Sequence, residues 1–257
     1  MTEFHHLQSK LKVLKLAGML NSLEHRLGQA QSENLGFLDF LELLLEDEIQ
    51  CRARHSLAAR VSRARFDAVK TFEEFDFSAD AALPVQQIRD LATCHYLEAH
   101  SSVLICGPVG AGKTHVAQAL GMEACRRGYS VLFTKTTHLL RELGGGRADG
   151  TWQERLHRYL KPDLLILDDF AMKEFTSAQA EDMYELIDGR VGHSSLIVTS
   201  NRGPQDWYGL FPNPVLGESA LDRLVNAAHH LMLRGKSYRP RLRPGQGGVV
   251  AKEVRGQ

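Results

Sequence analysis

The sequence lacks most of the features that mark secreted and membrane proteins. It holds only four cysteines in 257 residues, and the absence of any C-x-x-C pair argues against a disulfide framework and against a zinc site. No run approaches about 18 consecutive apolar residues, and the N-terminus has neither the charged start nor the apolar centre of a signal peptide. We therefore expect a cytoplasmic protein with no membrane contact. The cysteines, which we expect to be buried reduced thiols, are Cys51, Cys94, Cys106 and Cys125.

A formal net charge is absent as well, because 31 Lys and Arg balance 31 Asp and Glu. The charges are nevertheless unevenly distributed along the chain. Residues 52–70 hold six Lys and Arg against one acid, and the segment from Arg223 onward holds eight against Glu253. Local basic surfaces therefore matter more than the total charge.

Strand patterns are missing from the first 70 residues. Apolar residues recur every three or four positions from Leu7 to Leu27, which predicts a helix with one apolar face. A second helical pattern begins near Phe37 and continues into the sixties. We expect an all-helical N-terminal domain over residues 1–70, for assembly, partner or DNA contact, followed by a connector over residues 71–84.

Beyond the connector, short β runs alternate with helical stretches, which is typical of an α/β fold with a parallel sheet flanked by helices. Each run is almost entirely apolar, as expected for strands buried on both faces. A capping box at Thr176 and Gln179 predicts a helix that ends near Val191. We place this domain at residues 85–239 and a mobile basic tail at residues 240–257. The predicted strands are Ser102–Cys106, Val131–Lys135, Leu164–Leu167 and Leu196–Thr199.

A complete G-x-x-x-x-G-K-T loop connects the first predicted strand to a helix over Thr114–Arg127. In this setting the backbone N–H groups converge on phosphate oxygens at a helix N-terminus. Lys113 would reach the β and γ phosphates of ATP, and the Thr114 hydroxyl would bind Mg²⁺. A plain glycine turn is the weaker alternative. The predicted ATP-binding residues are Gly107, Pro108, Val109, Gly110, Ala111, Gly112, Lys113 and Thr114.

Two later strands end in polar groups that would lie beside this loop. Asp168 and Asp169 follow Leu164–Leu167, so Asp168 is expected to hold Mg²⁺ and Asp169 to orient or deprotonate the attacking water. Asn201 follows the strand Leu196–Thr199 and is expected to bridge the γ-phosphate and that water. The alternative for Asn201 is a turn former.

Arg223 is a third candidate catalytic residue. It falls on a predicted helix and would serve as an arginine finger for the nucleotide of a neighbouring subunit. A surface arginine, solvated or paired on its own helix, is the other interpretation.

Together these pieces resemble the IstB-like ATP-binding proteins of insertion sequences, relatives of the DnaC and DnaI helicase loaders in the initiator clade of AAA+ ATPases. The likeness covers nearly the whole chain, and Asp169, Asn201 and Arg223 match the family's second Walker B, sensor and finger positions. Its most specific motifs are Thr71-Phe-Glu-Glu-Phe-Asp-Phe, Gly-Lys-Thr-His115, Leu-Leu-Ile-Leu-Asp-Asp and the Leu-Asp-Arg-Leu box at 221–224.

The resemblance implies an AAA+ core preceded by helices in a bacterial cytoplasmic protein. It also implies ATP-dependent assembly into a ring or spiral homo-oligomer, binding to duplex DNA and regulation of the transposase of the same insertion sequence. From the loop and the two acids we expect ATP hydrolysis that depends on Mg²⁺, is slow and requires assembly. Only 18 residues follow Arg239, too few for the usual C-terminal lid. Arg239 would then replace a lid arginine, or contact DNA or solvent.

The position of the DNA contact is open between two basic stretches. One corresponds to the helical insertion through which initiator-clade proteins contact DNA, and the other is the helix Arg52–Lys70; either is otherwise a solvated charged face. The paired histidines His5-His6 and His229-His230 lack metal-ligand spacing. The candidate DNA-binding residues of the insertion are Lys135, Arg141, Arg147, Arg155 and Arg158.

Four functions remain open from the sequence. The first is an ATP-dependent regulator that assembles on duplex DNA and recruits or stimulates a transposase. The second is a replicative helicase loader of the DnaC/DnaI type. A small-molecule P-loop kinase is disfavoured because no acceptor pocket is recognisable after Asp168. The fourth is a nucleotide switch with rare hydrolysis, which Asp169, one methylene shorter than Glu, makes plausible.

Overall fold

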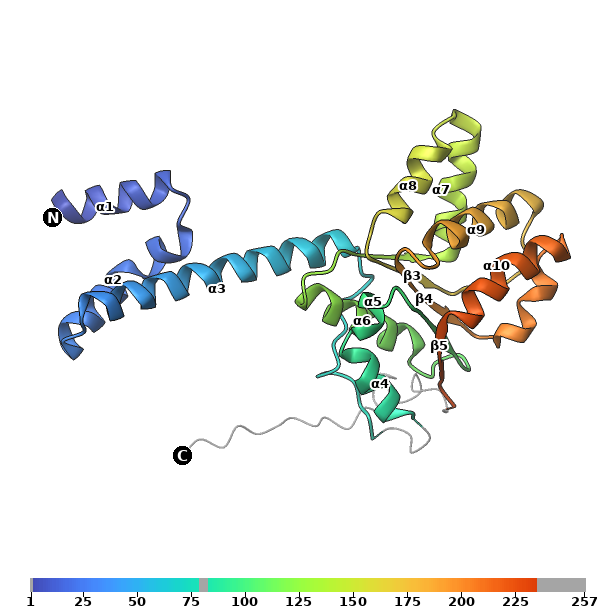
Figure 1. Cartoon of the computed structure of the whole chain (residues 1–257), viewed down its shortest axis with the longest axis horizontal. Coiled ribbons are helices and arrows are strands. Elements are labelled where there is room, and N and C mark those ends of the chain that lie inside the picture. The colour runs from blue at the N-terminus through green and yellow to red at the C-terminus, as the bar shows by residue number, and fades with distance from the viewer. Residues whose placement is uncertain (1, 79–82, 235–257) are drawn as a thin grey trace, which may run out of the picture. The chain divides into compact units, whose positions relative to one another are not determined.

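The computed structural model describes residues 2–78 and 83–234, the side chains from Phe4 onward (Figure 1). The chain divides into two compact units, Met1–Arg60 and Val61–Gln257. The division falls within helix α3 (Phe37–Ala64), earlier than the domain end expected at residue 70, which stays a prediction.

The first unit contains α1 (Thr2–Val13), α2 (Ala17–Glu33) and most of α3, around a small core of Leu11, Met19, Leu23 and Leu44. The expectation of one helix from Leu7 to Leu27 is wrong, because the chain turns at Lys15, whose φ is 56°. The N–H of Leu16 donates to the carbonyl of Leu11, and that of Lys15 to Lys12, which is the Schellman pattern of a helix end. The long second helix is confirmed.

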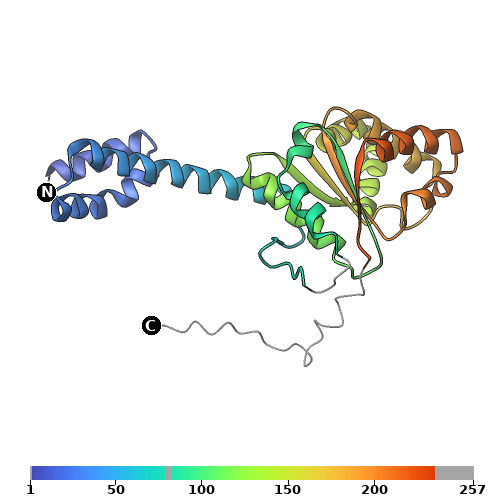
Figure 2. The same cartoon turned by 60° about the horizontal axis from the view of Figure 1, so that its bottom comes forward.

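The second unit is built on a five-stranded parallel sheet in the order β2-β3-β4-β1-β5 (Figures 1 and 2). The four predicted strands are confirmed, and β3 and β4 extend beyond their expected ends. β1, β3 and β4 are buried throughout, so both of their faces are covered. The strands are β1 (Ser102–Cys106), β2 (Val131–Lys135), β3 (Leu164–Asp168), β4 (Ser195–Ser200) and β5 (Ala228–Met232).

Helices cover both faces of this sheet (Figure 2). On one face α6 (Lys113–Arg126) packs against β1 to β4, and α4 (Val85–Ala92) packs against α6. On the other face side chains of alternate strand positions, such as Leu165 and Val198, meet the apolar sides of the remaining long helices. Those helices are α7 (Thr136–Asp149), α8 (Trp152–Leu160), α9 (Ser177–Arg190) and α10 (Pro214–Asn226).

The smaller elements complete this unit. α5 (His95–Glu98) precedes β1, and the short 3-10 helices η1 (Pro204–Asp206) and η2 (Tyr208–Leu210) lie between β4 and α10. The predicted capping box is confirmed: Gln179 N donates to Thr176 Oγ1, and Thr176 N donates to Gln179 Oε1. No helix in residues 2–78 and 83–234 is both long and apolar enough to cross a membrane.

Cys94, Cys106 and Cys125 are buried as expected, but Cys51 is only half-buried. Burial raises the pKa of the Cys94 and Cys106 thiols to about 11.

Candidate nucleotide site

The loop between β1 and α6 has the backbone of a phosphate cradle. Gly110 and Gly112 have φ values of 82° and 93°, a region that side-chain-bearing residues rarely adopt. The loop therefore curls over the N-terminus of α6, and Gly112 is the N-cap residue of that helix. Backbone N–H groups and the positive end of the helix dipole meet there, which fits an anion such as a triphosphate.

Lys113 connects this loop to the carboxyl end of β4. Its Nζ donates to the carbonyls of Gly107 and Pro108 at 2.9 and 2.8 Å and to Asn201 Oδ1 at 2.6 Å. The lysine is only 7% exposed, whereas Asn201 lies at the surface. Because the ammonium is held by the amide oxygen of Asn201, the NH₂ group of that amide is left to donate elsewhere.

Thr114 and Asp168 meet on the other side of Lys113. Thr114 Oγ1 lies 2.9 and 3.1 Å from the two carboxylate oxygens of Asp168, at the end of β3. Asp168 is 2% exposed. Burial raises the pKa of its carboxyl, and hydrogen bonds from Thr199 and Thr114 oppose that shift. A hydroxyl next to a carboxylate is an all-oxygen donor set, so these residues fit Mg²⁺.

Asp169 follows in a left-handed conformation, with φ at 56°. Its N–H donates to Thr199 Oγ1 at 3.1 Å, and the residue is only partly buried. The two adjacent acids therefore have different surroundings, since Asp168 is enclosed and Asp169 is open to solvent. This difference suits a metal ligand followed by a residue that handles water.

The structure thus gathers five predicted side chains at one edge of the sheet: Lys113, Thr114, Asp168, Asp169 and Asn201. Arg223 is not among them. It lies on α10 and pairs with Asp188 of α9, and about half of its side chain is exposed. A position on the surface is what an arginine needs if it is to act on a neighbouring copy.

Two further residues, Thr199 and Phe75, contribute to this site and are not evident from the sequence. Thr199 bonds to both Asp168 and the Asp169 N–H, but in the sequence it was one more residue of an apolar strand. Phe75 of the connector stacks edge-on against His115 at 5.1 Å, and a methyl group on Gly112 would lie 3.2 Å from its ring. The aromatic spacing of the connector was visible, but its place beside the loop was not.

The predicted DNA contacts of the α7–α8 insertion have mixed surroundings. Arg147 pairs with buried Asp182 at 2.8 Å and lies over the Trp152 ring. Arg155 pairs with Asp149, and Lys135 pairs with Asp67 at 3.3 Å. These three cations are therefore held by carboxylates of their own chain.

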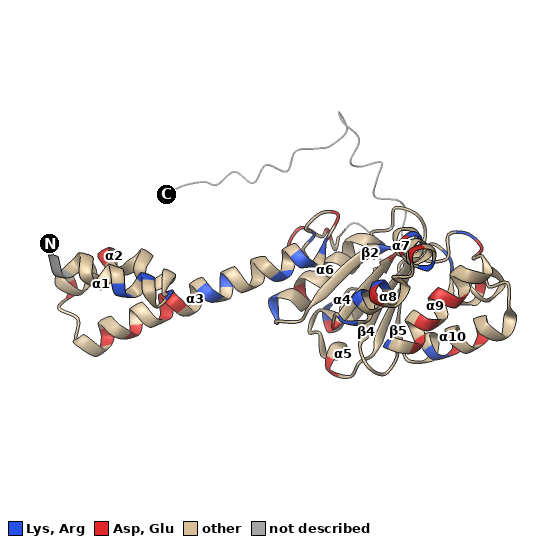
Figure 3. Cartoon of the chain, turned by 90° about the horizontal axis from the view of Figure 1, so that it is seen from above, with Lys and Arg blue, Asp and Glu red and all other residues tan. Residues whose placement is uncertain are grey.

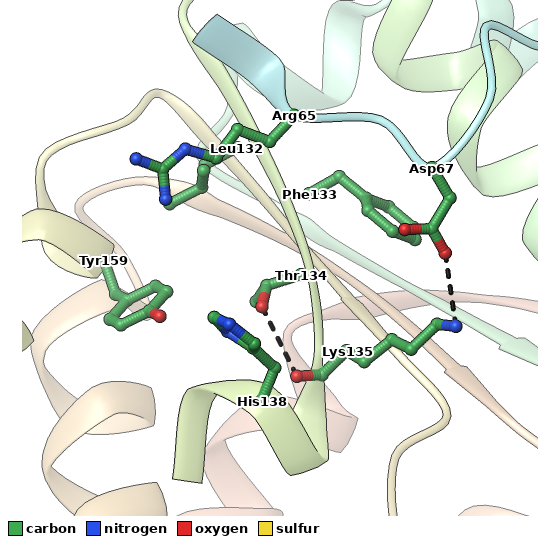
Figure 4. A pocket seen from close by; sticks show the side chains of 8 residues that line it. All are labelled: Arg65, Asp67, Leu132, Phe133, Thr134, Lys135, His138 and Tyr159. Atoms are coloured by element: carbon green, nitrogen blue, oxygen red, sulfur yellow. Dashed lines mark hydrogen bonds and ion pairs between the residues drawn. The ribbon is translucent and has the colours of Figure 1, made fainter. Parts of the chain in front are cut away.

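Lys135 lines a cavity of about 250 Å³ beside edge strand β2. Figure 4 shows Arg65, His138 and Tyr159 at one side of this cavity and the Lys135–Asp67 ion pair at the other. Arg141 and Arg158 are exposed on α7 and α8, and neither side chain makes a hydrogen bond or ion pair with another described residue. These two arginines are the cations of the insertion most available to a phosphate.

The competing basic stretch, expected as a helix over Arg52–Lys70, is helical only as far as Ala64, where α3 ends. Figure 3 shows acids along the first half of α3 and basic residues, all of them arginines, along its second half. Within it Arg52 pairs with Glu48 at 2.7 Å, and Arg60 donates to Ser56 at 2.7 Å. Arg239 and the tail at 240–257 lie outside the described residues.

Comparisons with known proteins find relatives that match most of the chain. A family model described as IstB-like ATP binding protein matches residues 9–244. An insertion-sequence ATP-binding protein of Mycobacterium tuberculosis is 53% identical over 241 residues, which cover 93% of this chain and 96% of that relative. The insertion sequence IS21 ATP-binding protein of Pseudomonas aeruginosa is 32% identical, covering 97% of this chain and 94% of its own.

Among solved structures, the DnaC helicase loader matches with a TM-score of 0.56 and 22% identity, covering 66% of this chain and 98% of its own. This likeness shows the fold. The expected AAA+ core, a parallel sheet flanked by helices and preceded by helices, is confirmed; the expected absence of a lid concerns residues outside those described.

Proposed function

This chain belongs to the IstB-like ATP binding protein family, and from that premise we propose that it is a Mg²⁺-dependent ATPase that regulates transposition. It assembles on duplex DNA as a ring or spiral, recruits or stimulates the transposase of its insertion sequence, and uses ATP hydrolysis to control that assembly. The observation that carries the ATPase proposal is the convergence of Lys113, Thr114, Asp168 and Asn201 at the loop.

Each residue of the site has a separate role in ATP binding or hydrolysis. The loop N–H groups and Lys113 bind the phosphates, and Thr114 with Asp168 would hold Mg²⁺, which would neutralise negative charge on the triphosphate. Asp169 takes the proton of the attacking water. The NH₂ group of Asn201, oriented by the bond from Lys113 to its oxygen, positions that water or the γ-phosphate. Arg223 of a neighbouring subunit stabilises the charge that develops during transfer.

The transposition role is supported by the relatives, which are ATP-binding proteins of insertion sequences and match over almost their full lengths. The DNA contact is supported by Arg141 and Arg158, exposed on neighbouring helices of the insertion. We assign Lys135, Arg147 and Arg155 to the same basic surface, where their ion pairs keep the insertion in shape as well.

Two substitutions test the ATPase. Lys113→Ala removes the fixed cation at the loop, so ATP binding, measured by calorimetry, should become undetectable. Asp169→Asn keeps the phosphate contacts, so ATP binding should stay within about threefold while turnover falls at least 100-fold. Lys12→Ala, an exposed lysine of α1, is the matched control and should behave as wild type. Unchanged turnover in Asp169→Asn would overturn the assignment of the base.

Assembly distinguishes the transposition regulator from a helicase loader. The protein is sized by light scattering with ATP, with and without duplex or single-stranded DNA. Growth on the duplex supports the proposed function. Growth only on single strands, together with co-purification of the replicative helicase, would favour the loader.

A further inference from the structure

Thr199 lies at the carboxyl end of β4, between the nucleotide loop and the two acids that follow β3. It is 1% exposed. Neither its burial nor its place in an apolar strand requires a hydroxyl, because valine has nearly the same shape and fills the preceding, fully buried position Val198. A polar group that is fully buried needs partners, and those partners indicate what it does.

The hydroxyl of Thr199 makes two bonds, and their directions are fixed. The backbone N–H of Asp169 only donates, so Thr199 Oγ1 accepts from it, at 3.1 Å. The proton of Thr199 is then free to be donated to Asp168 Oδ1, at 2.5 Å. One hydroxyl therefore orients the side chain of the first acid and the backbone of the second.

Further bonds tie the same turn to β4. The N–H of Phe170 donates to the Thr199 carbonyl at 2.8 Å, and Ser200 Oγ donates to the Phe170 carbonyl at 3.0 Å. On the other side, Thr136 Oγ1 donates to the Asp168 carbonyl at 3.0 Å. The backbone of the turn is thus held by β4 on one side and by the first residue of α7 on the other. Among the described residues, the side-chain hydrogen bonds to the Asp168 carboxylate come from the hydroxyls of Thr114 and Thr199.

The hydroxyls of Thr114 and Thr199 would have different roles when nucleotide and Mg²⁺ are bound. Thr114 is the hydroxyl that would bind Mg²⁺ itself, which withdraws it from the carboxylate. Thr199 lies on the strand behind Asp168 and stays available in both states. Thr199 would therefore keep the Asp168 carboxylate oriented toward the metal position when the Thr114 hydroxyl leaves that carboxylate to bind Mg²⁺.

The left-handed conformation of Asp169 adds a second requirement. Residues with a Cβ adopt positive φ only where surrounding contacts impose it. The bond from its N–H to Thr199 is such a contact, and it decides where the Asp169 carboxylate points.

We propose that Thr199 is a positioning residue for ATP hydrolysis, which orients the Asp168 carboxylate toward Mg²⁺ and the Asp169 carboxylate toward the attacking water without contacting nucleotide. This inference rests on the proposed ATPase function. A purely structural residue would affect stability, whereas a positioning residue affects metal binding and turnover in a folded protein.

The test uses Thr199→Val, which keeps the shape and removes the hydroxyl, and Thr199→Ser, which keeps the hydroxyl and removes the methyl. We expect Thr199→Val to bind ATP without Mg²⁺ as wild type does, to need at least fivefold more Mg²⁺ for half-maximal ATP binding, and to lose at least 30-fold in turnover. Thr199→Ser should stay within about threefold of wild type in both. Thr199→Ala, which no packing clash can unfold, should repeat the Thr199→Val result.

A second readout needs neither metal nor nucleotide. Amide hydrogen exchange at Asp169 should be faster in Thr199→Val than in wild type and unchanged in Thr199→Ser. Thr134→Val, at a buried threonine of β2 outside the site, is the matched control and should leave all of these quantities unchanged. Equal Mg²⁺ dependence and turnover in wild type and Thr199→Val, or equal losses in Thr199→Ser and Thr199→Val, would overturn the proposal.

These experiments distinguish a failure of the proposed ATPase function from a failure of the Thr199 proposal. If wild type binds ATP but never hydrolyses it, the ATPase function fails, and the Mg²⁺ dependence of binding and the Asp169 exchange still decide the orientation of the turn. If wild type hydrolyses ATP and the Thr199 variants match it, only the Thr199 proposal fails.

Discussion

Arg190 is the most deeply buried charge among the described residues of the second unit, with no exposed surface. Its guanidinium donates to the carbonyls of Tyr159 and Ser195 at 2.7 Å and to Pro162 at 2.9 Å. Burial lowers its pKa to about 10. One cation therefore joins the end of α8, the start of β3 and the start of β4.

Replacing this side chain should destabilise the protein. Arg190→Met keeps the apolar stem but leaves several buried carbonyls without donors, so we expect a loss of about 3 kcal/mol or more in the free energy of unfolding. Urea unfolding measures it. Arg127→Met removes an exposed ion pair and should change the same quantity by less than about 1 kcal/mol. Similar losses in both variants would contradict the role given to Arg190.

The site residues differ in how far the sequence reveals them. Lys113 and Asp168 stand out because each follows a strand with a recognisable motif, and the chemistry of phosphate and Mg²⁺ demands those residue types. Thr199 and Arg190 do not stand out, and the sequence singles out Arg223 without revealing its partner Asp188. Each owes its role to partners many positions away, which only the folded chain identifies.

The first backbone N–H groups of α2 are capped by a side chain of another helix, α3. The carboxylate of Glu48, buried in α3, accepts the N–H groups of Gly18 and Met19 at 2.7 and 3.2 Å. Negative charge is favoured at this end of a helix. The close approach leaves no room for a side chain on Gly18, where a methyl would lie 2.6 Å from the Glu48 Cα.

Two glycines of α2 should therefore respond oppositely to the same change. Gly18→Ala should destabilise the first unit by about 1 to 3 kcal/mol, because the clash and the displaced cap outweigh the helix propensity of alanine. Gly28→Ala, where nothing lies within 4 Å, should stabilise it by up to about 1 kcal/mol. Hydrogen exchange of the α2 amides in the full chain measures both. A stabilising Gly18→Ala would show that α2 and α3 are not packed this closely.

Periodicity predicted α3 and the central strands well because each is long or continuously apolar. It failed at Lys15, since the apolar spacing runs on through the turn and the left-handed position carries a lysine instead of glycine. It also failed for β5, where only Leu231 is buried and both His229 and His230 are exposed. Edge strands carry a weak apolar pattern because one side has no neighbour.

Two basic surfaces of the molecule compete as the DNA contact: the α7–α8 insertion and the second half of α3. Arg141→Gln and Arg158→Gln should each weaken duplex binding and reduce the dependence of log K on log salt by about 0.9, as expected for one lost phosphate contact. Fluorescence anisotropy over a salt series measures this slope. Arg54→Gln, at an exposed arginine of α3, should leave it unchanged. The reverse result would place the DNA on α3.

The order of the sheet also governs when the nucleotide site comes into being during synthesis. β1, which carries the loop, pairs only with β4 and β5, and both are made later than β1. At about 5 to 20 residues per second, the residues between Ser102 and Ala228 take roughly 6 to 25 s to be made. If synthesis stops before β4, the chain therefore carries a loop motif that is complete in sequence, but β1 has neither of the strands that pair with it.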